Sequence, residues 1–285
     1  MSILSIQSSV AYGHVGNSAA VFPLQRLGIE VWPVVTVHFS NHAGYGHWRG
    51  PLLAAEDLRE VLTGIEERGV LGRCDAVLSG YQGAEEVGEV VLDAVARVKA
   101  ANPNAVYCCD PVMGDTGRGF FVRPGIPEYL RDHVIPLADI ATPNHFELDF
   151  LTGRAERSTT LAGVLEAVDD LRAMGPDTVL VTSVVHDGMG EDTLELVAVD
   201  RTGGWLVSTP LLPISVNGAG DLTTALFLAH LLETRSAATA LARTASSVWG
   251  VLEETARSGE REIQIIAAQD RIAHPDERFE VVTLR

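Results

Sequence analysis

The sequence has almost no lysine, and this shortage excludes several kinds of chemistry. Lys99 is the one lysine among 21 lysine and arginine residues, and it lies in a polar stretch before Pro103, where a helix is expected to end. A Walker-type phosphate loop needs a lysine after its glycines, and a Schiff-base enzyme needs a lysine in a pocket. We therefore expect a solvated Lys99 and neither type of site.

Positive charge and long apolar runs are also scarce. The 38 acidic residues outnumber the 21 basic ones, which gives a net charge of −17 and disfavours binding to nucleic acid or to an acidic membrane surface. No stretch has the roughly 18 to 20 apolar residues of a membrane span. The N-terminal segment Met1–Gln7 lacks the cationic part of a signal peptide and is typical of a first strand. We expect a cytoplasmic protein whose partners are small molecules.

Cysteine is equally sparse. Cys74, Cys108 and Cys109 are odd in number and show no Cys-x-x-Cys spacing. We expect buried thiols rather than disulfides or a cysteine metal site.

The 285 residues, 46% of them hydrophobic, are enough for one large domain, and we expect a single domain over residues 1–285. Apolar strand-like segments alternate with segments of helical period. This order favours a mainly parallel sheet covered by helices on both faces, a three-layer α/β sandwich. The strands are expected at Ile3–Ser8, Val31–Phe39, Ala76–Ser79, Ala105–Cys109, Ile140–Thr142 and Thr178–Thr182, and helices at Glu56–Arg68, Glu85–Ala100 and Leu161–Met174.

The C-terminal third has a different pattern. Thr193–Val199 and Trp205–Thr209 flank a glycine-containing turn and predict a late antiparallel hairpin. Two helices are expected after it, at Asp221–Glu233 and Ser236–Ala256. From Glu262 onward we expect another edge strand followed by a short helix.

Ligands of open α/β sheets bind beyond the carboxyl ends of the strands, and four such places contain unusual residues. The first is a glycine turn that leads into an apolar helix. Gly218 and Gly220 allow backbone N–H groups to converge at the helix N-terminus as an anion site, without a lysine. Asp221 then lies in the first turn, where an acid acts either as a catalyst or as a helix cap.

The second place follows the strand that ends at Cys109. Asp110 is a carboxylate at a strand end, and the glycine-rich segment 114–124 comes next. Asp110 is a candidate for binding a cation or a phosphate-bound water, and the segment is a candidate lid. An ordinary loop is the alternative.

The third place is the strand end, proline and helix start at residues 141–147. Asn144 and Glu147 are three residues apart, which places them on one helical face and is also the spacing of a capping box. Combined with Asp110, Glu147 is a candidate for Mg²⁺, which needs only one or two carboxylates when phosphates and water complete its shell.

The fourth place is the aromatic, histidine-rich loop 39–50. It lacks the ligand spacing of a zinc site. We expect it to form a wall for a flat aromatic ligand.

Several of these segments together resemble a known family. Asn-Gly-Ala-Gly-Asp at 217–221 resembles the C-terminal signature of the ribokinase-like superfamily. The narrower resemblance, to pyridoxal kinases, covers nearly the whole chain from Ile3 to about Ile272. It rests on the order of the segments 6–8, 12–17, 39–42, 78–81, 109–114 and 142–144.

The resemblance implies a ribokinase-like fold and an ATP-dependent, dimeric kinase with Mg²⁺ and a monovalent cation such as K⁺. It implies phosphorylation of the 5′-hydroxymethyl group of pyridoxal, with pyridoxine and pyridoxamine as candidate further acceptors. It implies Asp221 as general base and Gly218, Ala219 and Gly220 as anion hole. The implied substrate contacts are Ser8, Val15, Ala43, Gly44 and Tyr81. The implied nucleotide and cation positions are Asp110, Asp115, Thr142, Asn144, Glu147, Thr182, Ser183, Thr209, Pro210, Leu211 and Leu212, with Mg²⁺ at Asp110 and Glu147 through water.

Two positions depart from the family pattern. Ala43 stands where the family commonly has threonine, so only a backbone contact to the substrate remains there. Phe121 falls where the lid often has an aromatic hydroxyl. A hydroxymethylpyrimidine or sugar kinase of the same superfamily, and a non-catalytic vitamin B6 reservoir, are the alternatives.

Overall fold

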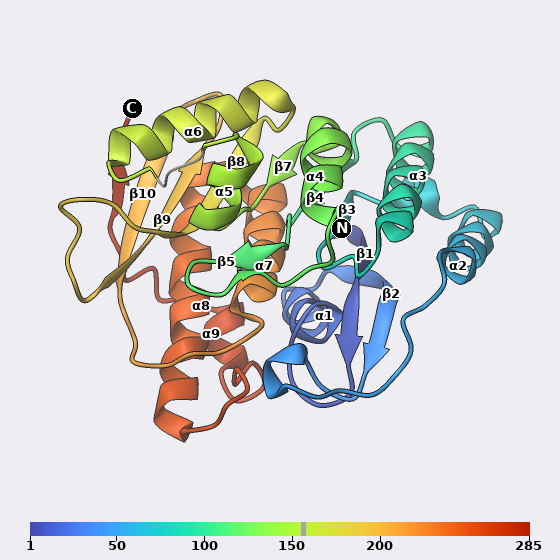
Figure 1. The fold of residues 1–285 in the computed structure, drawn as a ribbon, viewed down its shortest axis with the longest axis horizontal. Coiled ribbons are helices and arrows are strands. Elements are labelled where there is room, and N and C mark those ends of the chain that lie inside the picture. Colours follow the sequence, from blue (N-terminus) through green and yellow to red (C-terminus); the bar gives the residue numbers. More distant parts are fainter. Residues whose placement is uncertain (155–157) are drawn as a thin grey trace.

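A nine-stranded sheet forms the centre of the molecule (Figure 1). The computed structural model describes residues 1–154 and 158–285, and in these residues the strand order is β11-β10-β9-β8-β7-β4-β3-β1-β2. The strands are β1 (Ser2–Val10), β2 (Glu30–Phe39), β3 (Ala76–Ser79), β4 (Val106–Cys109), β7 (Ile140–Ala141), β8 (Thr178–Val184), β9 (Thr193–Val199), β10 (Gly204–Pro210) and β11 (Val281–Thr283). A separate two-stranded hairpin pairs β5 (Gly114–Asp115) with β6 (Gly119–Phe120).

The type of strand pairing changes once across the sheet. The six strands from β2 to β8 pair in parallel, whereas β9, β10 and β11 pair antiparallel. Consequently the carboxyl ends of the parallel strands lie at one edge, together with the end of β10 and the start of β9. The late antiparallel hairpin that the sequence predicts is confirmed.

Helices cover both faces of the sheet. They are α1 (Asn17–Arg26), α2 (Ala55–Glu67), α3 (Glu85–Ala101), α4 (Ile126–Tyr129), α5 (His145–Leu151), α6 (Leu161–Met174), α7 (Ala219–Thr234), α8 (Ala237–Ser258) and α9 (Gln269–Ala273). One apolar core joins the sheet to α2 through α6, and a second joins it to α1, α7 and α8. The predicted three-layer sandwich is therefore confirmed.

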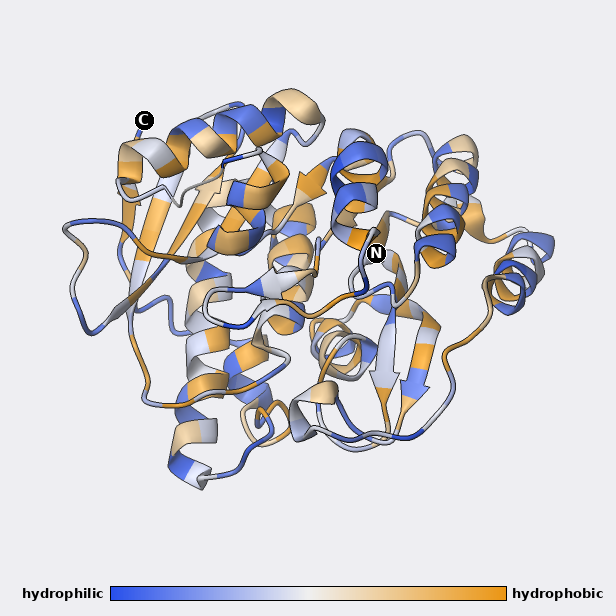
Figure 2. Ribbon diagram, in the orientation of Figure 1, coloured by the Kyte–Doolittle hydropathy of each residue, from blue (hydrophilic) through white to orange (hydrophobic). Residues whose placement is uncertain are grey.

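Alternation along the strands sends neighbouring side chains into different cores. Tyr107 and Cys109 lie in the first core and Cys108 in the second, as expected for side chains of period two. In Figure 2 the strands β7, β9 and β10 are mostly hydrophobic, while the helices carry both colours, because only one side of each helix faces the sheet.

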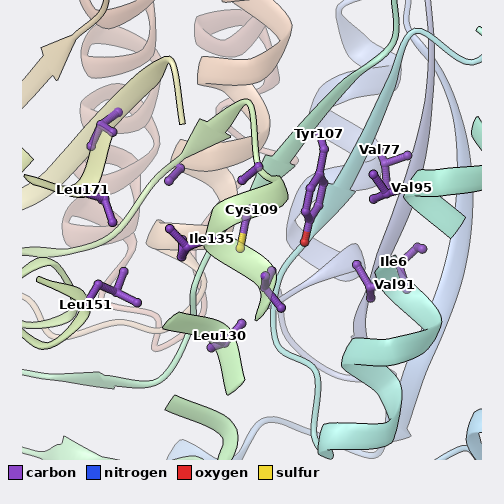
Figure 3. Packing of buried hydrophobic residues seen from close by; sticks show 14 of the residues in the cluster. Ile6, Val77, Val91, Val95, Tyr107, Cys109, Leu130, Ile135, Leu151 and Leu171 are labelled. Atoms are coloured by element: carbon purple, nitrogen blue, oxygen red, sulfur yellow. The ribbon is translucent and has the colours of Figure 1, made fainter. Parts of the chain in front are cut away.

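The first core contains the side chains of Tyr107 and Cys109 from β4. The ring of Tyr107 lies on the side of the core that contains Val77, Val91 and Val95 (Figure 3), and its hydroxyl forms a hydrogen bond of 2.8 Å with Ser79 Oγ. This bond satisfies the polar atom of a fully buried side chain. The bond also joins β4, the strand that Asp110 follows, to β3.

Three details differ from the sequence expectations. Helix α1 was not predicted, because it contains Pro23, which usually interrupts a helix. The short helix α4 was also not predicted. The expected edge strand and short helix after Glu262 both form, but in the opposite order: α9 precedes β11, since the edge of β10 remains unpaired until the final residues reach it.

Other expectations hold. All three cysteines are buried and free. The expectation for Lys99 holds only in part, because the residue lies at the end of α3 as expected but is half-buried and forms an ion pair of 2.7 Å with Asp139, at the amino edge of the sheet. Across residues 1–154 and 158–285, no helix has the length and apolar character needed to cross a membrane.

Candidate active site

The candidate residues gather at the carboxyl edge of the sheet, although they come from all parts of the chain. Ser8 lies near the end of β1, Tyr81 follows β3, Asp110 follows β4 and Thr142 follows β7. The start of α7 lies against this edge, because Thr224 Oγ1 forms a hydrogen bond of 2.8 Å with Thr142 Oγ1. The structure thus places the two main candidate groups, around Asp110 and Asp221, at one site.

The turn before α7 requires glycine at one position. Gly218 caps the helix with φ of +88°, and a Cβ atom there would collide with the backbone oxygen of His14. Outside its own helix and its chain neighbours, Gly220 has no atom within 4 Å of the place where its Cβ would lie. The N-terminus of α7, formed by Gly218, Ala219 and Gly220, is therefore open at Gly220, and an anion site at this terminus requires such space.

Asp221 lies in the first turn of α7 and is partly buried. Burial raises its pKa to about 6, although hydrogen bonds from the backbone N–H groups of Gly16 and of Asp221 itself oppose the rise. A carboxylate with a pKa near neutrality is suited to accept a proton during turnover. The position fits both expected roles, because a first-turn acid also interacts favourably with the helix dipole.

Asp110 is buried and near two other carboxylates. Burial raises its pKa well above the ordinary value, and the charges of Glu147 and Asp221 raise it further, while a hydrogen bond with Thr224 acts in the opposite direction. Within the described residues, none of these three acids forms an ion pair with lysine or arginine. No basic side chain of the described residues therefore neutralises these acids.

Asn144 and Glu147 form the capping box that their spacing predicts. Asn144 Oδ1 accepts from the N–H of Glu147 at 2.9 Å, and Glu147 Oε2 accepts from the N–H of Asn144 at 2.9 Å. Glu147 Oε1 also accepts from the N–H groups of Met113 and Gly114. Burial raises the pKa of Glu147 to about 7, and these backbone donors oppose the rise.

The donor set fits a hydrated divalent cation. In the described chain no group of three or more histidine, cysteine or acidic side chains is arranged to hold a metal ion. Asp110 and Glu147 are the two acids expected to hold a cation, and Glu147 already accepts three backbone hydrogen bonds. A cation of the Mg²⁺ type, bound mostly by water and phosphate oxygens, is the kind that such a sparse set of acids can hold.

The candidate lid at residues 114–124 starts as a hairpin. Asn144 Nδ2 donates to the backbone oxygen of Gly114 at 2.8 Å, which ties the base of the hairpin to α5. Phe120 packs edge-on against Phe146 and Phe150 at 5.1 Å between ring centroids. Asp115 forms an ion pair of 3.1 Å with Arg118.

The nucleotide candidates at the other end of the edge also lie together. The N–H of Thr182 donates to the oxygen of Pro143 at 3.0 Å, and Thr182 bridges to Asn144. Ser183 has φ of +51°, a strained conformation for a non-glycine residue, at a bulge in β8. Thr209, Pro210, Leu211 and Leu212 follow at the end of β10; Thr209 is buried and Leu211 is exposed.

The substrate candidates line the opposite side. Ser8 is buried beside Gly16, where a Cβ atom would collide with Ser8. Val15 and Tyr81 are half-buried, and burial raises the pKa of Tyr81. Ala43 and Gly44 are exposed in a short 3₁₀ turn after β2.

Sequence reasoning missed the residues that hold this substrate side. Glu262, near the C-terminus, is buried and contacts the loops that contain His14 and His42. Asn17 donates to backbone oxygens of Gln7 and Val34 and so joins α1 to two strands. Contacts over such long sequence separations leave no periodic or motif signal; the histidine-rich loop was the sole hint.

An open pocket of about 550 Å³ lies on the outer part of the same loop. Its lining is Ser40, Asn41, His47, Trp48 and Arg49. It includes none of the carboxylates described above, so we do not assign the reaction to it.

The sheet order and the glycine turn at the start of α7 define a ribokinase-like α/β fold, the fold of a class of kinases. A family model described as phosphomethylpyrimidine kinase matches residues 71–265. Pyridoxal kinase PdxY of Rubrobacter xylanophilus is 63% identical over 282 residues, covering 99% of this chain and 97% of the relative. Pyridoxal kinase PdxY of Leifsonia xyli is 61% identical over 281 residues, covering 99% of each.

Solved structures agree with these relatives. Pyridoxal kinase from Leishmania donovani in complex with ADP and pyridoxine has a TM-score of 0.91 at 29% identity, covering 100% of this chain and 99% of the other. The chain therefore belongs to the pyridoxal kinase family.

Proposed function

We propose that the protein transfers the γ-phosphoryl group of ATP to the 5′-hydroxymethyl group of pyridoxal, giving pyridoxal 5′-phosphate. The observation that carries this proposal is Asp221, a partly buried acid with a pKa of about 6, directly after a glycine turn that is open at Gly220. Relatives with the name pyridoxal kinase, at up to 63% identity over nearly the full length, support the substrate.

In this mechanism Asp221 accepts the proton of the hydroxymethyl group as its oxygen bonds to phosphorus. An alcohol is a weak nucleophile while protonated, so a base within hydrogen-bond reach accelerates the step. The N–H groups of Gly218, Ala219 and Gly220 stabilise the negative charge on the phosphoryl oxygens. They supply the donors that a lysine provides in a Walker-type loop.

Asp110 and Glu147 would hold Mg²⁺ through water, and the bound ion would neutralise phosphate charge. The remaining nucleotide contacts are assigned to Asp115, Thr142, Asn144, Thr182 and Ser183, with the adenine beside residues 209–212. A monovalent cation such as K⁺ is assigned to the same side of the site. The hairpin at 114–120 excludes water when it closes.

The substrate lies between the ends of β1, β2 and β3. Ser8 donates or accepts a hydrogen bond, Val15 and Tyr81 form apolar walls, and the backbone of Ala43 and Gly44 contacts the ring. The glycine turn contains no cysteine, and the three cysteines are buried in other segments, so we expect no covalent adduct between a thiol and the pyridoxal aldehyde.

The family model's description, phosphomethylpyrimidine kinase, favours a second candidate, a kinase of a related methylpyrimidine such as hydroxymethylpyrimidine. A coupled assay with pyridoxal, pyridoxine, pyridoxamine, hydroxymethylpyrimidine and ribose separates the candidates. We expect the highest kcat/KM with a B6 vitamer, and loss of activity with excess EDTA. Binding of pyridoxal without turnover of ATP would indicate a reservoir instead.

We also propose a homodimer that acts in the cytoplasm, where ATP is available and the free thiols stay reduced. Light scattering after size exclusion measures the mass of the particle. A mass of one chain, 30.5 kDa, at working concentration would refute the dimer.

A further inference from the structure

One buried carboxylate contacts two loops beside the proposed substrate pocket. Glu262 Oε1 accepts from Tyr45 Oη at 2.7 Å and lies 2.9 Å from His42 Nε2. Its second oxygen, Oε2, accepts from the backbone N–H of His14 at 3.0 Å. The partners are 217 to 248 residues away in sequence.

The close approach of this carboxylate leaves no room for a side chain at position 13. Gly13 has φ of +97°, and a Cβ atom there would collide with Glu262 Oε2. Burial opposes ionisation of Glu262, but the hydrogen bonds from Tyr45, His14 and His42 together lower its pKa below the ordinary value. The hydrogen bond with Glu262 in turn raises the pKa of Tyr45. At neutral pH, Glu262 is therefore ionised and Tyr45 keeps its hydroxyl proton.

Glu262 is itself fixed to the body of the protein. The next residue, Ile263, is fully buried in a cluster with Leu222 and Leu226 of α7. Gln264 donates from Nε2 to the backbone oxygen of Glu262 at 2.8 Å, and its N–H donates to Thr255 Oγ1 in α8. The backbone of Glu262 is thus fixed to α7 and α8, and its carboxylate in turn holds the loops at 13–14 and 42–45.

The loops that it holds meet the glycine turn. The backbone oxygen of His14 contacts Gly218 so closely that only glycine fits. A Cβ atom at Gly44 would lie 2.7 Å from Asn217 Nδ2. Arg261 adds a contact from the same segment: its guanidinium lies 4.0 Å from the Tyr45 ring centroid and donates to the oxygen of Gly44.

We propose that Glu262 is a positioning residue that sets the substrate loops at 13–14 and 42–45 against the glycine turn, and so determines affinity for the phosphoryl acceptor. The proposal rests on the proposed function for the identity of that acceptor. Because Ala43 has no hydroxyl, the acceptor is held there by backbone alone, and the placement of that backbone controls binding. Glu262 does not touch the reacting atoms.

The test is Glu262→Gln, with Glu260→Gln as the matched control. Glutamine replaces one carboxylate oxygen of Glu262 with an NH₂ group, which is a donor and would face another donor of the protein. Glu260 is a suitable control because it is exposed and lies two residues away. For Glu262→Gln we expect the KM for pyridoxal to rise about tenfold or more, as for loss of a hydrogen bond to a charged group. The KM for ATP should stay within twofold and kcat within threefold.

A second measurement does not depend on activity. Hydrogen exchange of the His14 amide and of residues 42–46 should be faster in Glu262→Gln than in wild type, and unchanged in Glu260→Gln. If the wild type fails to turn over ATP with pyridoxal, the proposed function is wrong, and this exchange still decides the positioning role. Equal exchange in all three proteins overturns it.

Two further outcomes also count against the proposal. A pyridoxal KM within twofold of wild type, or an equal rise in the KM for ATP, would reduce Glu262 to a general structural residue. If Glu262→Gln does not fold, Tyr45→Phe removes one donor and keeps the ring against Arg261. A several-fold rise in its pyridoxal KM supports the proposal, and an unchanged value refutes it.

Discussion

Replacement of Asp221 by asparagine separates a catalyst from a helix cap, because the two roles predict opposite changes. The amide is nearly isosteric and keeps the glycine turn, but it cannot accept a proton. We expect kcat to fall by roughly 10² to 10⁴, the range for a positioned general base. The KM for ATP should change by no more than a few-fold.

The same variant should be more stable, not less. Burial raises the pKa of Asp221 from 3.8 to about 6, so the folded state disfavours the charged form. Ionisation of Asp221 therefore destabilises the folded protein. This loss in the free energy of unfolding grows as pH rises from 3.8 to 6, and above pH 6 it reaches its full value of about 3 kcal/mol. Loss of the helix-dipole interaction costs up to about 1 kcal/mol, which leaves a gain of about 2 kcal/mol and a rise in Tm of about 4 °C at pH 8.

The assay is differential scanning calorimetry without nucleotide or divalent cation, with turnover measured on the same sample. At pH 5 the gain should be markedly smaller, because part of the Asp221 population is already protonated. Asp57→Asn, an exposed acid in the first turn of α2, is the control: it should lose a little stability and no activity. A variant of Asp221 with a lower Tm and more than about a tenth of the wild-type kcat would refute the reasoning.

Four other predictions follow from the site. Hydrogen exchange of residues 114–124 should slow when ATP and substrate are both present, while α3 stays unchanged; equal protection with and without ligands would indicate a static loop. Ala43→Thr should lower the KM for pyridoxal several-fold at constant kcat, measured by initial rates, because a side-chain hydrogen bond is added to the backbone contact. The kcat/KM for pyridoxal should exceed that for hydroxymethylpyrimidine, and the reverse order in the coupled assay would make the substrate assignment wrong. The kcat/KM for pyridoxal should fall about tenfold per pH unit below about pH 6, because protonated Asp221 cannot act as base; a flat profile from pH 5 to 8 would contradict this.

Much of the fold could be predicted, because strand and helix periods are local properties. The strands of the parallel half and the hairpin at 193–209 appear where expected. Helix α1 could not be predicted, since Pro23 argues against a helix and only packing against the second core outweighs that local preference. The predicted order of the last strand and the last short helix was wrong, because the pairing of β11 with β10 is a long-range contact.

The site was predictable to the extent that its residues follow strands or start helices. Asp110, Asn144 and Glu147 were found in this way, and the capping box between the last two is confirmed. The role of Thr224 could not be found, since it lies one turn inside an apolar helix and becomes relevant only when that helix meets Thr142. Glu262 is polar and late in the chain, and no spacing connects it with residues 14 and 45.

The contact between His14 and Gly218 has a consequence for biosynthesis. A chain made from its N-terminus exposes residues 13–14 and 42–45 long before the glycine turn exists, and their carboxylate anchor follows only at residue 262. The parallel strands can pair earlier, but until then these loops lack both the glycine turn and Glu262 as contacts. A nascent or C-terminally clipped chain that already contains most of its sheet would accordingly bind neither the acceptor nor the transferred phosphoryl group in productive geometry, and catalytic competence arrives in one late step of folding.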